Sequence, residues 1–122
     1  MNALSVARRM IAAIEAGDRA TIEALYSDDA VQHELPNALV PNGIRRDKPA
    51  ILAAFDRGAA LMAKQRLEIT NAVESGRHAA VEADFFGEAK NGKTFRARFA
   101  MFFEVVDGKI VSQRNYDCFD PF

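Results

Sequence analysis

The stretch TFRARFAMFFEVVDGKIVSQRNYDCF, from Thr94 to Phe119, decides the fold. Two runs rich in aromatic and β-branched residues, 94–106 and 109–119, flank the dipeptide Asp107-Gly108. Asp-Gly between two such runs is a strong hairpin signal, because both central positions of the tight turn need positive φ. The sequence therefore predicts two long antiparallel strands joined by a two-residue turn.

The preceding sequence extends this hairpin into a meander. After Lys64 the apolar period changes from 3.6 towards 2, and strands are predicted for 65–74 and 78–88. Ser75-Gly76-Arg77 separates these two strands, and Asn91-Gly92 separates the second of them from Thr94. The second half of the chain is thus expected to form four successive antiparallel strands.

The first half is predicted to be mainly helical. Residues 3–16 form an amphipathic pattern that Gly17 ends as a left-handed terminator. Asp18 is the expected cap of a short second helix that ends near Tyr26, before an acidic turn at 27–29. This short helix is expected to bury Ile22 and Leu25.

A short strand and a third helix complete this half. Residues 30–35 suit a strand that ends at Pro36, and an irregular loop rich in Pro, Asn and Gly follows as far as Gly43. Asp47 is the expected cap of the third helix, with Pro49 in its first turn. Its predicted buried stripe comprises Ile51, Leu52, Phe55, Ala59 and Met62.

Helices followed by a meander favour one α+β domain over residues 1–122, with three N-terminal helices packed on the concave face of a strongly curved, mostly antiparallel sheet. Such a cone-like α+β barrel leaves a tapering interior pocket, where small ligands commonly bind. The length of 122 residues matches a common single-domain size.

Composition argues against several classes of partner. The net charge of -1 and the isolated pairs Arg8-Arg9 and Arg45-Arg46 give no basic stripe, so no nucleic acid is expected as a partner. The longest apolar run, Ala50 to Phe55, is too short for a bilayer, and no secretory signal is evident, so we expect no membrane contact and a cytoplasmic location. The lone thiol of Cys118 suits a reducing compartment.

The order of elements, the segment LYSDDA at 25–30 and the segment DGKIVSQRNY at 107–116 resemble those of a known superfamily. The chain is similar to the nuclear transport factor 2-like, or SnoaL-like, group over nearly its whole length. That group includes ketosteroid isomerase, polyketide cyclases and limonene epoxide hydrolase. The resemblance implies the fold more strongly than any one activity.

Comparison with limonene epoxide hydrolase implies particular pocket positions. The cavity Arg and Asp of that enzyme correspond to Glu82 and Asp84, so only the Asp is kept. Its second catalytic Asp corresponds to Asn115, which is not a general acid, and its water-holding Tyr and Asn correspond to Val31 and His33. The enzyme's mechanism is therefore not carried over intact.

The other two relatives point to neighbouring positions. The base of ketosteroid isomerase falls at or beside Glu34, and its dienolate-stabilising acid falls near Phe99. The acid that a polyketide cyclase carries on the final strand matches Asn115 or, with a change of register, Asp117.

A proton-transfer site can be assembled from these positions. Asp84 is the expected general base, because an acid in an apolar pocket has its charged form disfavoured. His33 would be its partner or a ligand donor, and Asn115 would hydrogen-bond a substrate carbonyl. The other residues expected to contact the ligand are Glu82, Phe86, Ala97, Phe99, Met101 and Val31.

A structural interpretation stands beside each of these roles. Glu82 and Asp84 would equally suit an outer sheet face opposite Arg96 and Arg98, as cross-strand ion pairs. His33 would suit a pocket rim or a satisfied structural group. The aromatic residues would simply fill the interior, and Asn115 would satisfy a buried polar neighbour.

The sequence thus predicts a pocket for a small apolar molecule, with proton transfer of the isomerase or cyclase type on a carbonyl compound. The alternatives are a non-catalytic ligand-binding or dimerisation module and an epoxide hydrolase-like hydrolase. No metal and no cofactor are expected, since the two histidines are far apart and the thiol is remote. A homodimer through the outer sheet face is expected from the apolar content of both strand faces.

Overall fold

The computed structural model describes residues 2–121, which form three helices and six strands. Helix α1 spans Ala3–Ala16, and the side chain of Asn2 caps it by accepting a hydrogen bond from the Ser5 amide at 2.8 Å. Gly17 ends the helix at φ 65°, in the left-handed region that favours glycine. The predicted helix and its terminator are confirmed.

Helices α2 and α3 have the predicted caps. Asp18 caps α2 (Arg19–Leu25), and Asp47 caps α3 (Lys48–Leu61) by accepting from the Ala50 amide at 3.0 Å. The predicted stripe of α3 is only partly right. Ile51 and Leu52 are buried, but Ala59 is exposed. The buried stripe of α3 is therefore shorter than predicted.

The structure has two strands where the sequence predicted one. Strand β1 spans Tyr26–Glu34, so the acidic residues at 27–29 lie in a strand and not in the predicted turn. A shift in the pairing of β1 between Tyr26 and Val31 accommodates them. Strand β2, Ile44–Arg46, was not predicted; it has three residues and pairs with the end of β1.

The meander matches its prediction closely. Strands β3 (Met62–Ser75), β4 (His78–Ala89), β5 (Thr94–Val106) and β6 (Lys109–Phe119) pair antiparallel in succession. Asp107 and Gly108 both have positive φ, as the two-residue turn requires. In the Asn91-Gly92 turn only the glycine does, because that connection is four residues long.

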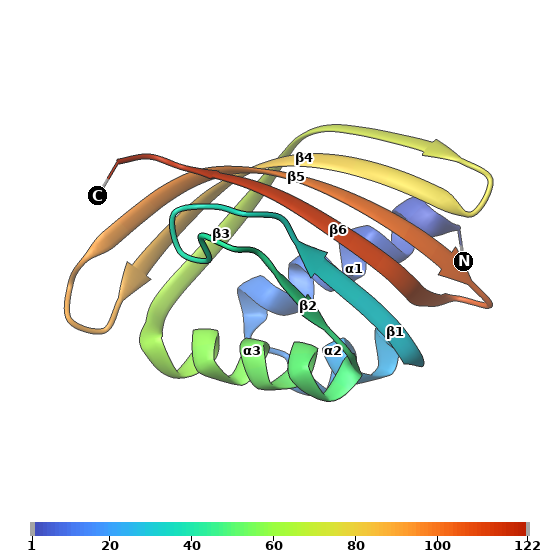
Figure 1. The fold of residues 1–122 in the computed structure, drawn as a ribbon, viewed down its shortest axis with the longest axis horizontal. Coiled ribbons are helices and arrows are strands. Elements are labelled where there is room, and N and C mark those ends of the chain that lie inside the picture. The colour runs from blue at the N-terminus through green and yellow to red at the C-terminus, as the bar shows by residue number, and fades with distance from the viewer. Residues whose placement is uncertain (1, 122) are drawn as a thin grey trace.

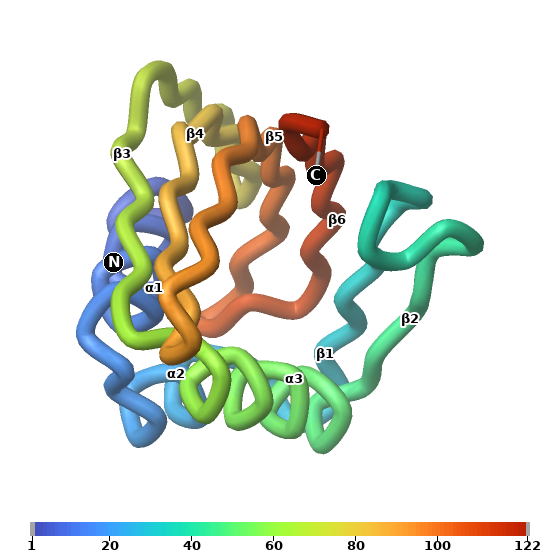
Figure 2. Tube along the Cα trace, turned by 90° about the vertical axis from the view of Figure 1, so that its left-hand side faces the viewer, coloured from blue at the N-terminus to red at the C-terminus, as the bar shows by residue number. Residues whose placement is uncertain are grey.

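The six strands form one sheet in the order β2-β1-β6-β5-β4-β3, in which β1 runs parallel to β6 and every other pair is antiparallel. Figure 1 shows this sheet as an arch with the three helices beneath it. Figure 2 shows α3 running along the base of the sheet, between β3 and the β1–β2 pair. The predicted α+β class and the curved sheet are confirmed.

Helix α1 packs under β3, β4 and β5 and closes one end of the arch. The most buried large side chains are Phe103, Met10, Ile22, Ile110, Val6 and Val81. A cavity lies between the helices and the concave face of the sheet, beside Met10. Within residues 2–121 no helix is long and apolar enough to cross a membrane.

Candidate functional site

A cavity of about 700 Å³ lies between the concave face of the sheet and α1 and α3. Apolar side chains form most of its surface, among them Leu67, Phe85, Phe95, Phe99, Met101 and Phe119. We call this space the main cavity. Its size and lining are those of pockets that bind small, largely apolar molecules.

A second hollow of about 380 Å³, the side lobe, adjoins the main cavity. The two share lining residues, including Tyr26, Gln32 and Leu39. The side lobe is the more polar of the two. It adds Glu34 and Arg46 from β1 and β2, and Arg57 from α3.

Asp117 is the only carboxyl group among the described residues that line the main cavity. It lies on β6, directly across from Phe99 on β5. Its Oδ1 oxygen is buried without a hydrogen-bond partner. The pKa of Asp117 is raised to about 7, chiefly by burial and also by the nearby charge of Glu34, while Arg46 acts in the opposite direction. Near neutral pH both protonation states of this carboxyl are therefore populated.

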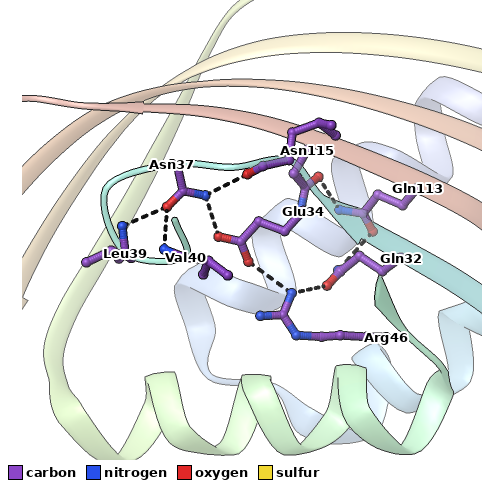
Figure 3. A network of polar contacts seen from close by, with 9 residues as sticks. Gln32, Glu34, Asn37, Leu39, Val40, Arg46, Gln113 and Asn115 are labelled. Carbon is purple, nitrogen blue, oxygen red and sulfur yellow. Dashed lines mark hydrogen bonds and ion pairs between the residues drawn. The ribbon is translucent and has the colours of Figure 1, made fainter. Parts of the chain in front are cut away.

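A chain of hydrogen bonds runs through residues that line the two hollows, and Figure 3 shows its part from Gln113 to Glu34. The Tyr26 hydroxyl donates to Oε1 of the buried Gln113, and Gln32 Nε2 donates to the same oxygen at 3.4 Å. Arg46 Nη1 donates to Gln32 Oε1 at 3.1 Å and to Glu34 Oε1 at 2.9 Å. Burial raises the pKa of the Tyr26 hydroxyl, so this group remains a neutral donor.

Asn115 lies between this chain and Asp117. Its Oδ1 accepts from Gln113 Nε2 at 2.8 Å, which directs the carbonyl side of the amide towards the network. Among residues 2–121, no hydrogen bond uses the Asn115 Nδ2 nitrogen. Because Asn115 lines the main cavity, this nitrogen is the available donor for a ligand oxygen.

Several of the predicted site residues occupy the interior. Asn115, Phe99 and Met101 line the main cavity. Ala97 lies on the same face and is 4% exposed, but it does not reach the cavity lining. Their common orientation follows from alternation along β5 and β6.

The predicted positions of Val31 and His33 inside the pocket are wrong. The parallel pairing of β1 with β6 sets Gln32 beside Gln113 and Glu34 beside Asn115, all of which face inward. Since neighbouring residues of a strand alternate, Val31 and His33 face the opposite side. At this end of β1 the pocket-lining residues are therefore Gln32 and Glu34.

The acids on β4 are also outside the pocket. Glu82 and Asp84 are exposed on the convex face, because the buried Ala83 between them points inward. Glu82 accepts from Asn71 Nδ2 at 3.1 Å, and Asp84 is paired in register with Arg98. The expectation that Asp84 turns into the cavity is wrong, and the outer-face interpretation describes its position.

Phe86 shares the convex face, where the guanidinium of Arg96 lies 4.8 Å from its ring centroid. Phe86 therefore does not line the main cavity, where it was expected. Its neighbour Phe85 faces inward and stacks on Phe99 with ring centroids 5.0 Å apart. Gly87 leaves room for this ring and for Met62, because a Cβ there would lie 2.2 Å from Met62 Cε.

Two residues that line the hollows were not among the predicted site residues: Asp117 and Arg46. Asp117 was matched only through a register change, yet it lies two residues after Asn115 and so shares its face. This two-residue spacing can be read directly from the sequence. Arg46 carried no such signal, because β2 is too short to show a period. Within residues 2–121, no cluster of three or more His, Cys, Asp or Glu side chains could hold a metal ion.

Several solved structures share this fold. IdmH, a proposed polyketide cyclase from Streptomyces antibioticus, aligns with a TM-score of 0.81 and 22% identity, covering 96% of this chain and 92% of its own. An LEH-like epoxide hydrolase from Mycobacterium tuberculosis aligns with a TM-score of 0.77 and 21% identity, covering 97% of this chain and 82% of its own. RV0760c from Mycobacterium tuberculosis, solved with estradiol-17beta-hemisuccinate, aligns with a TM-score of 0.79 and 24% identity, covering 93% of this chain and 92% of its own. At these identities the likeness shows the fold alone.

No curated protein matches the chain in sequence. The model of the SnoaL-like domain family matches residues 7–113, from within α1 to Gln113 in β6. The chain therefore belongs to the SnoaL-like domain family.

Proposed function

We propose that this protein binds a small, largely apolar carbonyl compound in the main cavity and that Asp117 moves a proton on it. The observation that carries the proposal is the Asp117 carboxyl, which has an unbonded oxygen in an apolar wall beside Phe99. Burial raises the pKa of Asp117 to about 7, so both of its protonation states are populated near neutral pH.

The proposed reaction uses Asp117 as base and then as acid. Its carboxylate takes a proton from the carbon next to the ligand carbonyl, and the electron pair of that C–H bond forms an enolate. The free Asn115 Nδ2 donates to the enolate oxygen, where negative charge develops. In an isomerisation the substrate is a β,γ-unsaturated carbonyl compound, so the electron pair spreads over a dienolate. Asp117 then returns the proton to the γ-carbon, and the double bond moves into conjugation with the carbonyl. In a cyclisation, the enolate carbon attacks a second carbonyl of the same molecule, and the proton goes to the new alkoxide.

The structural neighbours support the ligand class. One is a proposed polyketide cyclase, and another was solved with a steroid derivative. Both names describe apolar, oxygen-bearing molecules of a size that suits a space of about 700 Å³. A shared fold alone does not fix chemistry, so the residues of this chain carry the reaction proposal.

Exchange of α-protons tests the reaction without knowledge of the natural substrate. We expect the protein to accelerate deuterium incorporation into 2-tetralone or 2-acetylnaphthalene in D₂O near neutral pD, followed by proton NMR. Asp117→Asn should abolish the protein-dependent rate, because an amide does not act as a base. Binding of the same ketones, followed by thermal shift, should persist in the variant.

Asp84→Asn is the matched control, since it makes the same change on the convex face. It should leave the exchange rate unchanged. Equal exchange rates in Asp117→Asn and in the unmodified protein would exclude Asp117 as the base. Ligand binding without any accelerated exchange would favour the non-catalytic binding module.

We also propose that the protein is a homodimer through its convex sheet face. Exposed apolar side chains gather there, including Val73 at 61%, Phe102 at 37% and Tyr116 at 44%. Charged side chains of both signs surround them, including Arg66 and Glu68 on β3, Asp84 on β4 and Arg98 on β5. Two copies related by a twofold axis would bury the apolar side chains against each other within a charged rim.

A further inference from the structure

The guanidinium of Arg46 is only half used by the protein. Its side chain is 10% exposed, and its Nη1 nitrogen makes both of its hydrogen bonds, to Gln32 and Glu34. Its Nε nitrogen is buried without a partner, and no hydrogen bond within residues 2–121 uses Nη2. Figure 3 shows these two nitrogens on the side of the guanidinium away from Gln32 and Glu34.

The unused edge of Arg46 has a specific chemical meaning. Nε and Nη2 together form one fork of the guanidinium, whose two parallel N–H groups match the two oxygens of a carboxylate. A buried N–H without an acceptor is costly, so the folded protein gains when an oxygen reaches it. Arg46 lines the side lobe, and the side lobe shares Gln32 and Tyr26 with the main cavity. A ligand in the main cavity therefore lies next to the lobe that contains this fork.

The charges around the side lobe favour an anion. Its described lining has two arginines, Arg46 and Arg57, and one carboxylate, Glu34. Glu34 is already engaged, since it accepts from Arg46 on one oxygen and from Asn37 Nδ2 at 2.8 Å on the other. The Tyr26 hydroxyl is neutral. The exposed guanidinium of Arg57 and the unpartnered edge of the Arg46 guanidinium are thus left for a ligand.

We propose that the ligand carries a carboxylate group, which enters the side lobe and bonds Arg46 through Nε and Nη2 while the apolar part of the molecule fills the main cavity. This inference rests on the proposed function and narrows its substrate class to apolar carbonyl compounds with an acidic end. It places the reacting carbonyl near Asp117 and Asn115, and the acidic end beyond Gln32 at Arg46. Arg46 is then the residue that determines specificity.

Two nearly isosteric probes test the proposal. Naphthalene-2-carboxylate and naphthalene-2-carboxamide differ in charge but hardly in size. At pH 6 the probe acid is ionised, while Asp117, with a pKa of about 7, is mostly protonated and does not repel it. We expect the carboxylate to bind at least about tenfold more tightly by isothermal titration calorimetry, because charge-assisted fork bonds replace neutral ones.

Variants assign this preference to Arg46. Arg46→Gln should remove the preference and leave carboxamide affinity within about twofold, as expected for the loss of a charge-assisted pair. Arg46→Lys retains the charge without the fork, so it should lose most of the preference. Arg57→Gln is the matched control; it removes a rim charge from the same lobe and should retain most of the preference.

Arg46→Gln leaves Glu34 buried without its cation, so a direct readout on the unmodified protein is also needed. The Arg46 Nε–H resonance in ¹H–¹⁵N spectra should shift downfield when the carboxylate is added and hardly move with the carboxamide. Equal affinities for both probes, or an equal loss in Arg57→Gln and Arg46→Gln, would overturn the proposal while ketone binding and exchange stand. Failure of both naphthalene probes and the ketones to bind would instead overturn the proposed function, and this inference with it.

Discussion

Within residues 2–121, two buried side-chain atoms lack a hydrogen-bond partner, one on an acid and one on a base. Asp117 has an oxygen without a donor, and Arg46 has a nitrogen without an acceptor. Buried polar groups in folded proteins are nearly always paired, so two exceptions at one end of a molecule point to a function. The protein does not pair them with each other; each lines one of two adjoining hollows.

The raised pKa of Asp117 predicts a dependence of stability on pH. Folding raises this pKa from 3.8 to about 7, so between these values the folded state binds the proton more tightly than the unfolded state does. The free energy of unfolding should therefore fall as pH rises from about 4 to about 7. Asp117→Asn removes this cost, so it should be more stable than the unmodified protein at pH 8 by at most about 4 kcal/mol.

Urea denaturation at pH 4.5 and at pH 8 measures this difference directly. The gain of Asp117→Asn should be small at the lower pH, where Asp117 is protonated in the folded state. A gain of the same size at both values would show that it comes from packing and not from ionisation.

At the scale of elements, the sequence was most informative where side chains repeat over many residues. The β5–β6 hairpin has both a long period-2 pattern and a turn dipeptide that needs positive φ, and its limits were predicted correctly. Strand β1 has neither, so its start and its facing were misjudged. A one-residue error in a strand reverses every side chain, and for this reason His33 was predicted inside the pocket in place of Gln32.

The position of Asp84 shows a second reason why site prediction failed. Either face of β4 offered a sensible environment for an acid, and alternation alone does not say which face is inward. Small residues at Ala79, Ala83 and Gly87 mark the helix-facing side of this strand. Because the sequence does not show which face of β4 the helix α1 covers, these small residues alone did not settle which way Asp84 points.

The loop between β1 and β2 bounds both hollows. Leu39 in this loop lines both hollows, and one side chain organises the loop. Asn37 Oδ1 accepts from the Leu39 amide at 2.9 Å and from the Val40 amide at 3.1 Å, while its Nδ2 donates to Glu34. The loop is thus tied to the buried pair of Glu34 and Arg46.

Asn37→Ala should loosen this loop. We expect faster hydrogen–deuterium exchange at the Leu39 and Val40 amides, since both lose their acceptor, and weaker retention of ligands in the cavity. Asn91→Ala is the matched control, because Asn91 accepts from the Lys93 amide at 3.0 Å in a different turn. It should leave the exchange of Leu39 and Val40 unchanged. Unchanged protection in Asn37→Ala would mean that the loop is held by other contacts.

At the scale of the whole molecule, the two faces of the sheet have separate roles. The concave face encloses the cavity, whereas the convex face exposes aromatic side chains that no part of residues 2–121 covers. Phe102 and Tyr116 meet edge to face on it at 5.7 Å, and Arg114 lies 5.4 Å from the Phe102 ring centroid. Aromatic residues and arginine are enriched at protein interfaces, so this cluster is the expected centre of the dimer.

The proposed homodimer has a direct test in solution. Light scattering at micromolar concentration should give a mass near twice the 13.4 kDa of the chain. Phe102→Asp should raise the dimer dissociation constant by at least about tenfold, because it places a charge at the desolvated centre of the interface. Leu61→Asp is the control, since Leu61 is 67% exposed at the end of α3, away from the convex face, and it should leave the dimer intact. A monomer mass for the unmodified protein would contradict the dimer and leave the cavity proposals standing, because every residue that they use comes from one chain.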